Sequence, residues 1–106
     1  MIQLLAGQIT LVKNILTQYL PSHKTYVFGS RATNKAQKFS DLDLCIDGEK
    51  ISFTQMINLK EAFSESDIPY FVDIVQKATI SETFYNHIKS DFIELKINQT
   101  PVEPST

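Results

Sequence analysis

The chain has 106 residues, of which 42% are hydrophobic and 21% charged, a composition that fits one globular domain and leaves no room for a second core. Ten basic and twelve acidic residues give a net charge of −2, which argues against stable binding to duplex nucleic acid. The single cysteine, Cys45, excludes an intramolecular disulfide and suits a reducing compartment. With no basic leader and no apolar run of about 18 residues, we expect a cytoplasmic protein that does not enter a membrane.

The first third of the chain predicts a helix, a strand and a loop. Apolar residues recur at three- and four-residue steps over 2–20, which is typical of an amphipathic helix. Residues 24–28 are rich in β-branched and aromatic side chains and predict a strand that ends at Gly29. The polar and basic stretch 30–40 predicts a short helix followed by a loop.

The middle of the chain predicts a strand, a helix and a second strand. Residues 41–47 alternate between an acidic face and an apolar face, as a half-buried strand does. Ser52 and Gln55 have the spacing of a capping box and precede apolar residues at helical spacing, so we predict a helix over 52–65. The apolar run 70–75 predicts a buried strand.

The end of the chain predicts a last helix and a tail. Thr79 and Glu82 have capping-box spacing, and apolar residues continue at near-helical steps to Leu95. The polar segment 98–106 contains two prolines and predicts a flexible tail, which leaves residues 1–97 as the domain. Alternating helices and strands of this kind predict a two-layer α+β fold in which helices cover a small sheet.

Three aspartates are the candidate catalytic and metal-binding residues. Asp41 and Asp43 point to the same side of one strand, with Cα atoms about 6.5 to 7 Å apart. Asp73 interrupts an apolar strand, where aspartate is rare unless it has a partner or a function. Two such charges 4 Å apart repel by about 4 kcal/mol at an effective dielectric constant of about 20. Two magnesium ions would remove this repulsion and suit phosphoryl or nucleotidyl transfer.

Gly29 and Ser30 are the candidate nucleotide-binding residues, together with Arg31. Glycine lets the backbone approach phosphate oxygens closely, and the Ser30 hydroxyl can donate a further hydrogen bond. Arg31, Lys35 and Lys38 would add positive charge. The sequence therefore predicts a site for a nucleoside triphosphate and a divalent metal.

Each part of this pattern also has an ordinary structural explanation. A Gly-Ser pair often forms a turn, and Asp-x-Asp is common on a solvated strand face. The three features together, in this order, are much more specific than any one of them. Other residues that could carry chemistry are assigned structural roles: Cys45 to packing, His23 to a loop, His87 to a helix face and Asp47 to a turn.

Residues 27–32 (VFGSRA) and 40–44 (SDLDL) resemble the minimal nucleotidyltransferase (MNT) signature of the DNA polymerase β-like superfamily, and the gap of ten residues between Gly-Ser and Asp-x-Asp matches it. The resemblance covers about residues 1–97. It implies a palm-like fold with a small mixed sheet, binding of ATP by Gly29 and Ser30, and ligation of two magnesium ions by Asp41, Asp43 and Asp73. Asp73 would also help to deprotonate the acceptor hydroxyl.

Small MNT proteins are typically encoded beside a HEPN-domain ribonuclease toxin. The resemblance thus implies an antitoxin that transfers AMP from ATP to a tyrosine hydroxyl of this toxin, in a hetero-oligomer with it. Two alternatives stay open: an antitoxin that neutralises the toxin by binding alone, and a nucleotidyltransferase that acts on a small molecule or an RNA end. A chain of this length has no room for its own acceptor domain, so another molecule must supply the acceptor.

Overall fold

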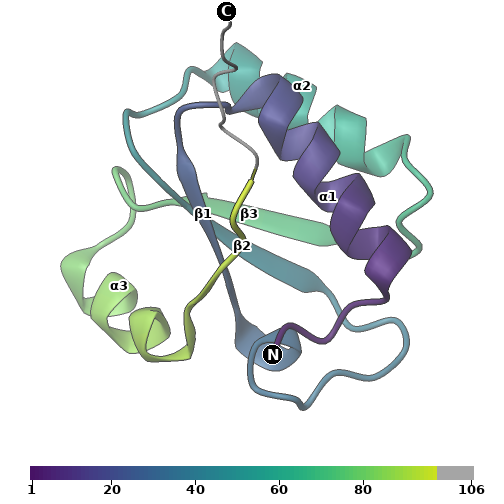
Figure 1. Cartoon of the computed structure of the whole chain (residues 1–106). Helices are drawn as coiled ribbons and strands as arrows, with labels where there is room; N and C mark the ends of the chain where they lie inside the picture. The colour runs from purple at the N-terminus through teal and green to yellow at the C-terminus, as the bar shows by residue number, and fades with distance from the viewer. Residues whose placement is uncertain (98–106) are drawn as a thin grey trace, which may run out of the picture.

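A mixed four-stranded sheet forms the centre of the protein in the computed structural model, which describes residues 1–97 (Figure 1). The elements, in chain order, are α1 (Ala6–Tyr19), β1 (Lys24–Phe28), the 3-10 turn η1 (Gly29–Arg31), β2 (Leu42–Asp47), α2 (Phe53–Ser64), β3 (Val72–Gln76), α3 (Glu82–Ile88), the 3-10 turn η2 (Lys89–Asp91) and β4 (Ile93–Glu94). The predicted α+β fold is confirmed. None of the helices within the described residues is long and apolar enough to cross a membrane.

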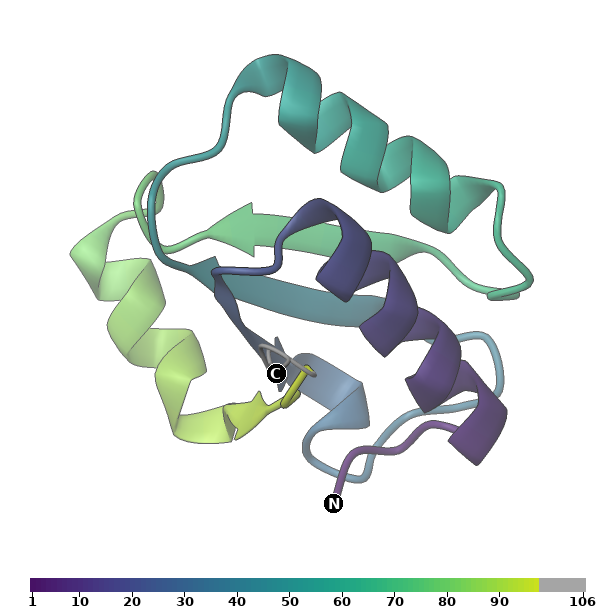
Figure 2. The same cartoon turned by 45° about the horizontal axis from the view of Figure 1, so that its top comes forward.

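The sheet has the strand order β3-β2-β1-β4. Strands β2 and β3 run parallel, whereas β1 is antiparallel to both β2 and β4. Helices α1 and α2 cover one face, and α3 lies against part of the other (Figures 1 and 2). The candidate site lies on this second face, at the end of the sheet where β2 and β3 begin.

The period-two pattern of β2 sorts its side chains between these two faces. Leu42, Leu44 and Ile46 are buried beneath α1 and α2, where they join the main core. The odd-numbered residues of β2 face the other way, and Cys45 among them packs with Phe28 and Ile88 under α3. A buried layer on one side thus fixes the acidic side chains on the other, because a register shift of one residue would exchange the two faces.

The helix starts show which local signals determine the structure. In α2 the predicted capping box is confirmed: the Ser52 hydroxyl accepts from the Gln55 amide at 3.0 Å, and Gln55 Oε1 accepts from the Ser52 amide at 2.9 Å. The predicted cap of α3 is wrong, because Ser81 and not Thr79 accepts the hydrogen bond, from the Phe84 amide. Helix α1 begins at Ala6 and not at residue 2, since the amide of Gln3 instead donates to the carbonyl of Arg31.

The predicted last helix is wrong beyond Ile88, where the chain turns and forms β4. The outer edge of β1 accepts this strand, with Val27 paired to Ile93 and Tyr26 to Glu94. Pairing with an open strand edge satisfies backbone groups that a longer α3 would have left unpaired on β1. The predicted tail, 98–106, lies outside the described residues.

Candidate active site

Asp43 and Asp73 come together because β2 and β3 are parallel neighbours. The two residues are directly paired in register, so their side chains leave the sheet on the same face. Neighbouring strands lie about 4.8 Å apart, which brings the two carboxyl groups within interaction distance. The structure therefore joins two candidate residues that are thirty positions apart in the sequence.

Asp41 lies just before β2, which begins at Leu42. It precedes Asp43 by two residues, and the charges of Asp41 and Asp73 both act on the Asp43 carboxyl group. Asp41 and Asp73 are exposed, whereas Asp43 is half-buried between them. The three carboxylates form one acidic cluster with Asp43 at its centre.

The pKa of Asp43 shows that a negative charge is unfavourable at this position. Burial, followed by the charges of Asp73 and Asp41, raises it from 3.8 to about 6. Desolvation and like charge both disfavour the ionised carboxylate. The fold thus holds Asp43 in a place where positive charge from a ligand would be favourable.

Gly29 lies directly against this cluster. It has φ of +75°, and a Cβ atom on it would overlap the Oδ2 atom of Asp43. Glycine is therefore required here for two reasons, its backbone conformation and the close approach of the carboxylate. Ser30 follows in η1 and is half-buried, so the Gly-Ser turn and the acidic cluster occupy the same end of the sheet.

Comparison with known proteins agrees with this geometry. The family model described as "Polymerase beta, Nucleotidyltransferase" matches residues 11–100. The chain belongs to this family. It is also 42% identical over 100 residues to the "Probable protein adenylyltransferase MntA" of Haemophilus influenzae, a match that covers 93% of this chain and 88% of the relative. The protein is thus a nucleotidyltransferase enzyme.

The acidic cluster fits a magnesium site of such an enzyme by its donor chemistry. All of its donors are carboxylate oxygens, the ligands that magnesium prefers. In residues 1–97, however, no three acidic, histidine or cysteine side chains are already close enough together to hold a metal ion. Completing the site would require the exposed Asp41 or Asp73 side chain to turn, or phosphate oxygens to join the ligands.

Arg31, the third candidate nucleotide-binding residue, is buried next to the Gly-Ser turn. Its side chain is only 5% exposed and donates hydrogen bonds to backbone carbonyl groups, among them that of Ser40 at 2.8 Å. Its guanidinium carbon lies 3.8 Å from the centre of the Tyr70 ring. In this structure the guanidinium makes these contacts within the fold, and the predicted role of Arg31 in nucleotide binding stays a prediction.

The remaining chemistry-bearing residues occupy ordinary structural positions. Cys45 is fully buried, and burial together with the charge of Asp47 raises the pKa of its thiol to about 11, so the predicted packing role is confirmed. The His23 ring contacts the Glu49 carbonyl at 2.7 Å, and His87 is exposed in the last turn of α3. Asp47 forms a 3.9 Å ion pair with Lys77. Lys35 and Lys38 are exposed in the loop after η1.

Proposed function

We propose that the protein is a magnesium-dependent protein adenylyltransferase that acts as an antitoxin, transferring AMP from ATP to a tyrosine hydroxyl of a HEPN ribonuclease. The pairing of Asp43 with Asp73, next to the Gly29–Ser30 turn, is the observation that carries this proposal. The similarity to the probable protein adenylyltransferase of Haemophilus influenzae supports the choice of AMP and of a protein acceptor.

The reaction requires one bond to form and one to break at the α-phosphorus of ATP. The tyrosine oxygen forms a new P–O bond, the bond to the bridging oxygen of pyrophosphate breaks, and pyrophosphate leaves with that electron pair. Asp73 is exposed on the face of the sheet that an acceptor can reach, so it is our candidate to take the hydroxyl proton.

The other site residues would hold the triphosphate in place. The Gly29–Ser30 turn lies directly against the Asp43 carboxylate, so its backbone would contact the phosphates beside the metal, and Ser30 would donate a hydrogen bond. Asp41, Asp43 and Asp73 would hold magnesium, which supplies positive charge to the phosphate oxygens during in-line displacement. Asp43, which is half-buried and flanked by the other two, would be the central ligand.

On this proposal a partner protein supplies the acceptor. Asp41 and Asp73 are exposed at the end of the sheet where β2 and β3 begin, so a second chain can reach them there. A second chain bound at this end of the sheet would present its tyrosine to Asp73. We therefore expect a hetero-oligomer with the toxin, in the cytoplasm where ATP is available.

Labelled ATP tests the proposal. The protein is incubated with α-labelled ATP, magnesium and the HEPN protein encoded beside it, and the label on the partner is measured. We expect label on a tyrosine of the partner with the wild-type chain and none with Asp43→Asn. The control variant Asp47→Asn removes an equivalent charge from the other end of the same strand face and should retain transfer.

The same experiment separates the two alternatives. A partner that stays unlabelled while its ribonuclease activity is still inhibited would indicate an antitoxin that acts by binding. Label that appears in a small molecule or on RNA, with none on the partner, would indicate another acceptor. Either result would overturn the proposed protein acceptor.

A further inference from the structure

Arg31 is the only arginine of the chain, and its side chain is buried. Its guanidinium donates to four backbone carbonyl groups, which belong to Gln3, Gln37, Lys38 and Ser40. It uses all three nitrogens for these bonds. A buried charge of this kind is stable only when it is fully hydrogen-bonded, and backbone carbonyl groups supply those bonds here.

The first connection that Arg31 makes is within the loop that joins the Gly-Ser turn to the Asp-x-Asp strand. Arg31 itself ends η1, which begins at Gly29. Its Nε and Nη2 atoms both donate to the carbonyl of Ser40, at 3.1 and 2.8 Å. Ser40 immediately precedes Asp41, so one side chain fixes the distance between the turn and the acidic strand.

The second connection is to the N-terminal segment through Gln3. The Arg31 carbonyl accepts from the Gln3 amide at 2.7 Å, and Arg31 Nη1 donates to the Gln3 carbonyl at 3.0 Å. The Gln3 side chain pairs with the backbone of Ala36, donating to its carbonyl and accepting from its amide, both at 2.9 Å. The N-terminal segment thus runs beside the loop after η1, as Figure 1 shows, and is hydrogen-bonded to it through Gln3.

The third connection is to the segment that leads into β3. The guanidinium stacks on Tyr70 at 3.8 Å, and Tyr70 lies three residues before Asp73. The next residue, Phe71, accepts through its carbonyl a 2.9 Å hydrogen bond from the Leu42 amide. The segments that carry Asp43 and Asp73 are therefore joined at the same place where Arg31 packs.

We infer that Arg31 and Gln3 are positioning residues for nucleotidyl transfer: they set the spacing between the Gly29–Ser30 turn, Asp41 and the start of β3. Neither side chain touches the substrate. The inference rests on the proposed function, because it concerns the same carboxylates. Lysine cannot replace Arg31 here, since one ammonium group does not reproduce a planar fork that reaches carbonyl groups in several directions.

Two variants and one matched control test this inference on the full chain. Arg31→Lys keeps the charge but loses the fork, and Gln3→Ala removes the two bonds to Ala36. Gln18→Ala removes an exposed glutamine near the other end of α1 and is the control. Steady-state transfer of AMP to the partner gives kcat and the KM for ATP, at a temperature where circular dichroism shows each variant to be folded.

We expect kcat to fall by about 100-fold in Arg31→Lys and by about 10-fold in Gln3→Ala, with smaller changes in KM, because misplacement of reacting groups by about 1 Å has effects of this size. Amide hydrogen exchange of the metal-free protein should become faster over residues 36–43 in both variants. Gln18→Ala should match the wild type in both measurements.

A lower melting temperature with unchanged kcat and unchanged exchange over 36–43 would show that Arg31 and Gln3 serve stability alone, and would overturn the inference. If Arg31→Lys does not fold, Gln3→Ala decides by the same criteria. Absence of transfer by the wild type would contradict the proposed function instead, and the exchange measurement would still test the positioning role.

Discussion

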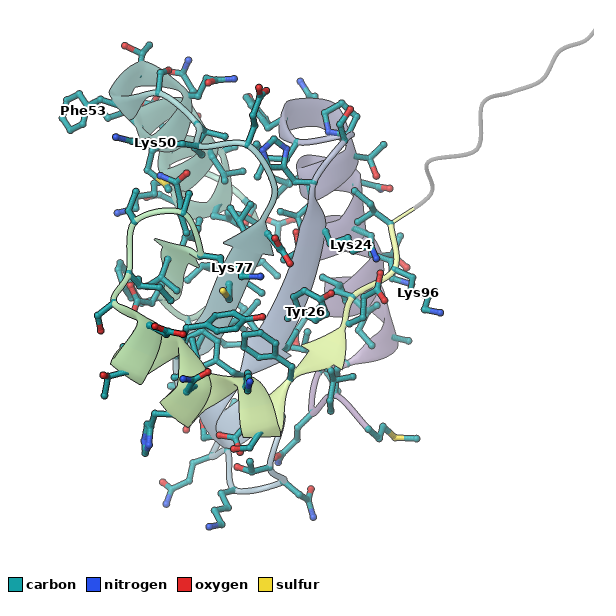
Figure 3. The ribbon with its side chains drawn as sticks, turned by 90° about the vertical axis from the view of Figure 1, so that its left-hand side faces the viewer. Lys24, Tyr26, Lys50, Phe53, Lys77 and Lys96 are labelled. Atoms are coloured by element: carbon teal, nitrogen blue, oxygen red, sulfur yellow. The ribbon has the colours of Figure 1, made fainter. Side chains whose placement is uncertain are left out.

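The two ends of β2 carry the same residue type on the same face, in opposite electrostatic environments. At one end Asp43 is flanked by Asp41 and Asp73, which raise its pKa together with burial. At the other end Asp47 pairs in register with Lys24 and forms an ion pair with Lys77, which lies over this face in Figure 3. Basic side chains thus lie next to Asp47 at one end of β2, whereas acidic side chains lie next to Asp43 at the other end. The difference points to a cationic ligand at the Asp43 end.

The largest expected difference between the two ends is catalytic. Asp43→Asn removes the central carboxylate of the cluster and should lower AMP transfer by about 1000-fold or more, in the range seen when charge stabilisation at a transition state is lost. Asp47→Asn should stay within about threefold of the wild type, since an exposed ion pair contributes little. Initial rates of label transfer measure both. Equal losses in the two variants would contradict a site confined to one end.

Asp73→Asn sharpens the comparison by altering the same end from the neighbouring strand. A general base contributes about 100-fold or more to the rate, so kcat should fall by about this factor while the KM for ATP changes less. Asp67→Asn, at an exposed position before β3, provides the control and should leave both constants unchanged. A loss confined to KM would argue that Asp73 binds substrate and takes no proton.

Gly29→Ala tests how closely the turn approaches the cluster. The added Cβ would meet Asp43 and the backbone would keep a positive φ, so we expect the free energy of unfolding to fall by about 2 kcal/mol and transfer to weaken. At Gly7 in α1 a Cβ would meet nothing within 4 Å, and Gly7→Ala should instead stabilise the protein by about 0.5 kcal/mol. Urea unfolding measures both changes, and a stable Gly29→Ala variant would refute the close contact.

The dependence of stability on pH should distinguish Asp43 from Asp47 in the metal-free protein. Because the pKa of Asp43 is about 6 in the folded chain and 3.8 without its environment, the folded state binds the proton more tightly. Protonation of Asp43 therefore stabilises the folded state, and this stabilisation is fully present below about pH 4 and is lost as the pH rises through 6. Between pH 4 and 7 the free energy of unfolding of Asp43→Asn should therefore rise by about 1 to 2 kcal/mol relative to that of the wild type, after allowance for the partial exposure of Asp43.

Unfolding in urea with a chelator present measures this difference at each pH. Asp47→Asn should show no such gain, because Asp47 loses a basic partner and not an acidic one. If the difference in the free energy of unfolding between Asp43→Asn and the wild type does not change with pH, the carboxylates of the cluster do not destabilise the metal-free fold by repulsion.

Local patterns were enough to predict most of the candidate site. Period-two alternation predicts a common face for Asp41 and Asp43, and an aspartate within an apolar strand marks Asp73. Their meeting depends on the parallel pairing of β2 and β3, which sequence patterns do not determine. The resemblance to a known family supplied that step.

The errors have physical causes that lie outside local sequence. The strand β4 forms because β1 offers an open edge, and this long-range pairing replaces the helix that the spacing of Phe92 and Leu95 suggests. The sequence also does not show that carbonyl groups from two separate parts of the chain, the N-terminal segment and the loop before β2, surround Arg31. The apolar residues Phe92, Ile93 and Leu95 do not alternate with polar ones at period two, so the sequence carries no clear local signal for β4.

Side-chain carboxyl NMR during a magnesium titration, with a non-hydrolysable ATP analogue present, tests most directly whether the three aspartates form one site. The carboxyl signals of Asp41, Asp43 and Asp73 should shift with a common midpoint, while that of Asp47 stays unchanged. An Asp73 signal that does not respond, or an Asp47 signal that shifts as much as the others, would contradict a single metal and nucleotide site at this end of the sheet.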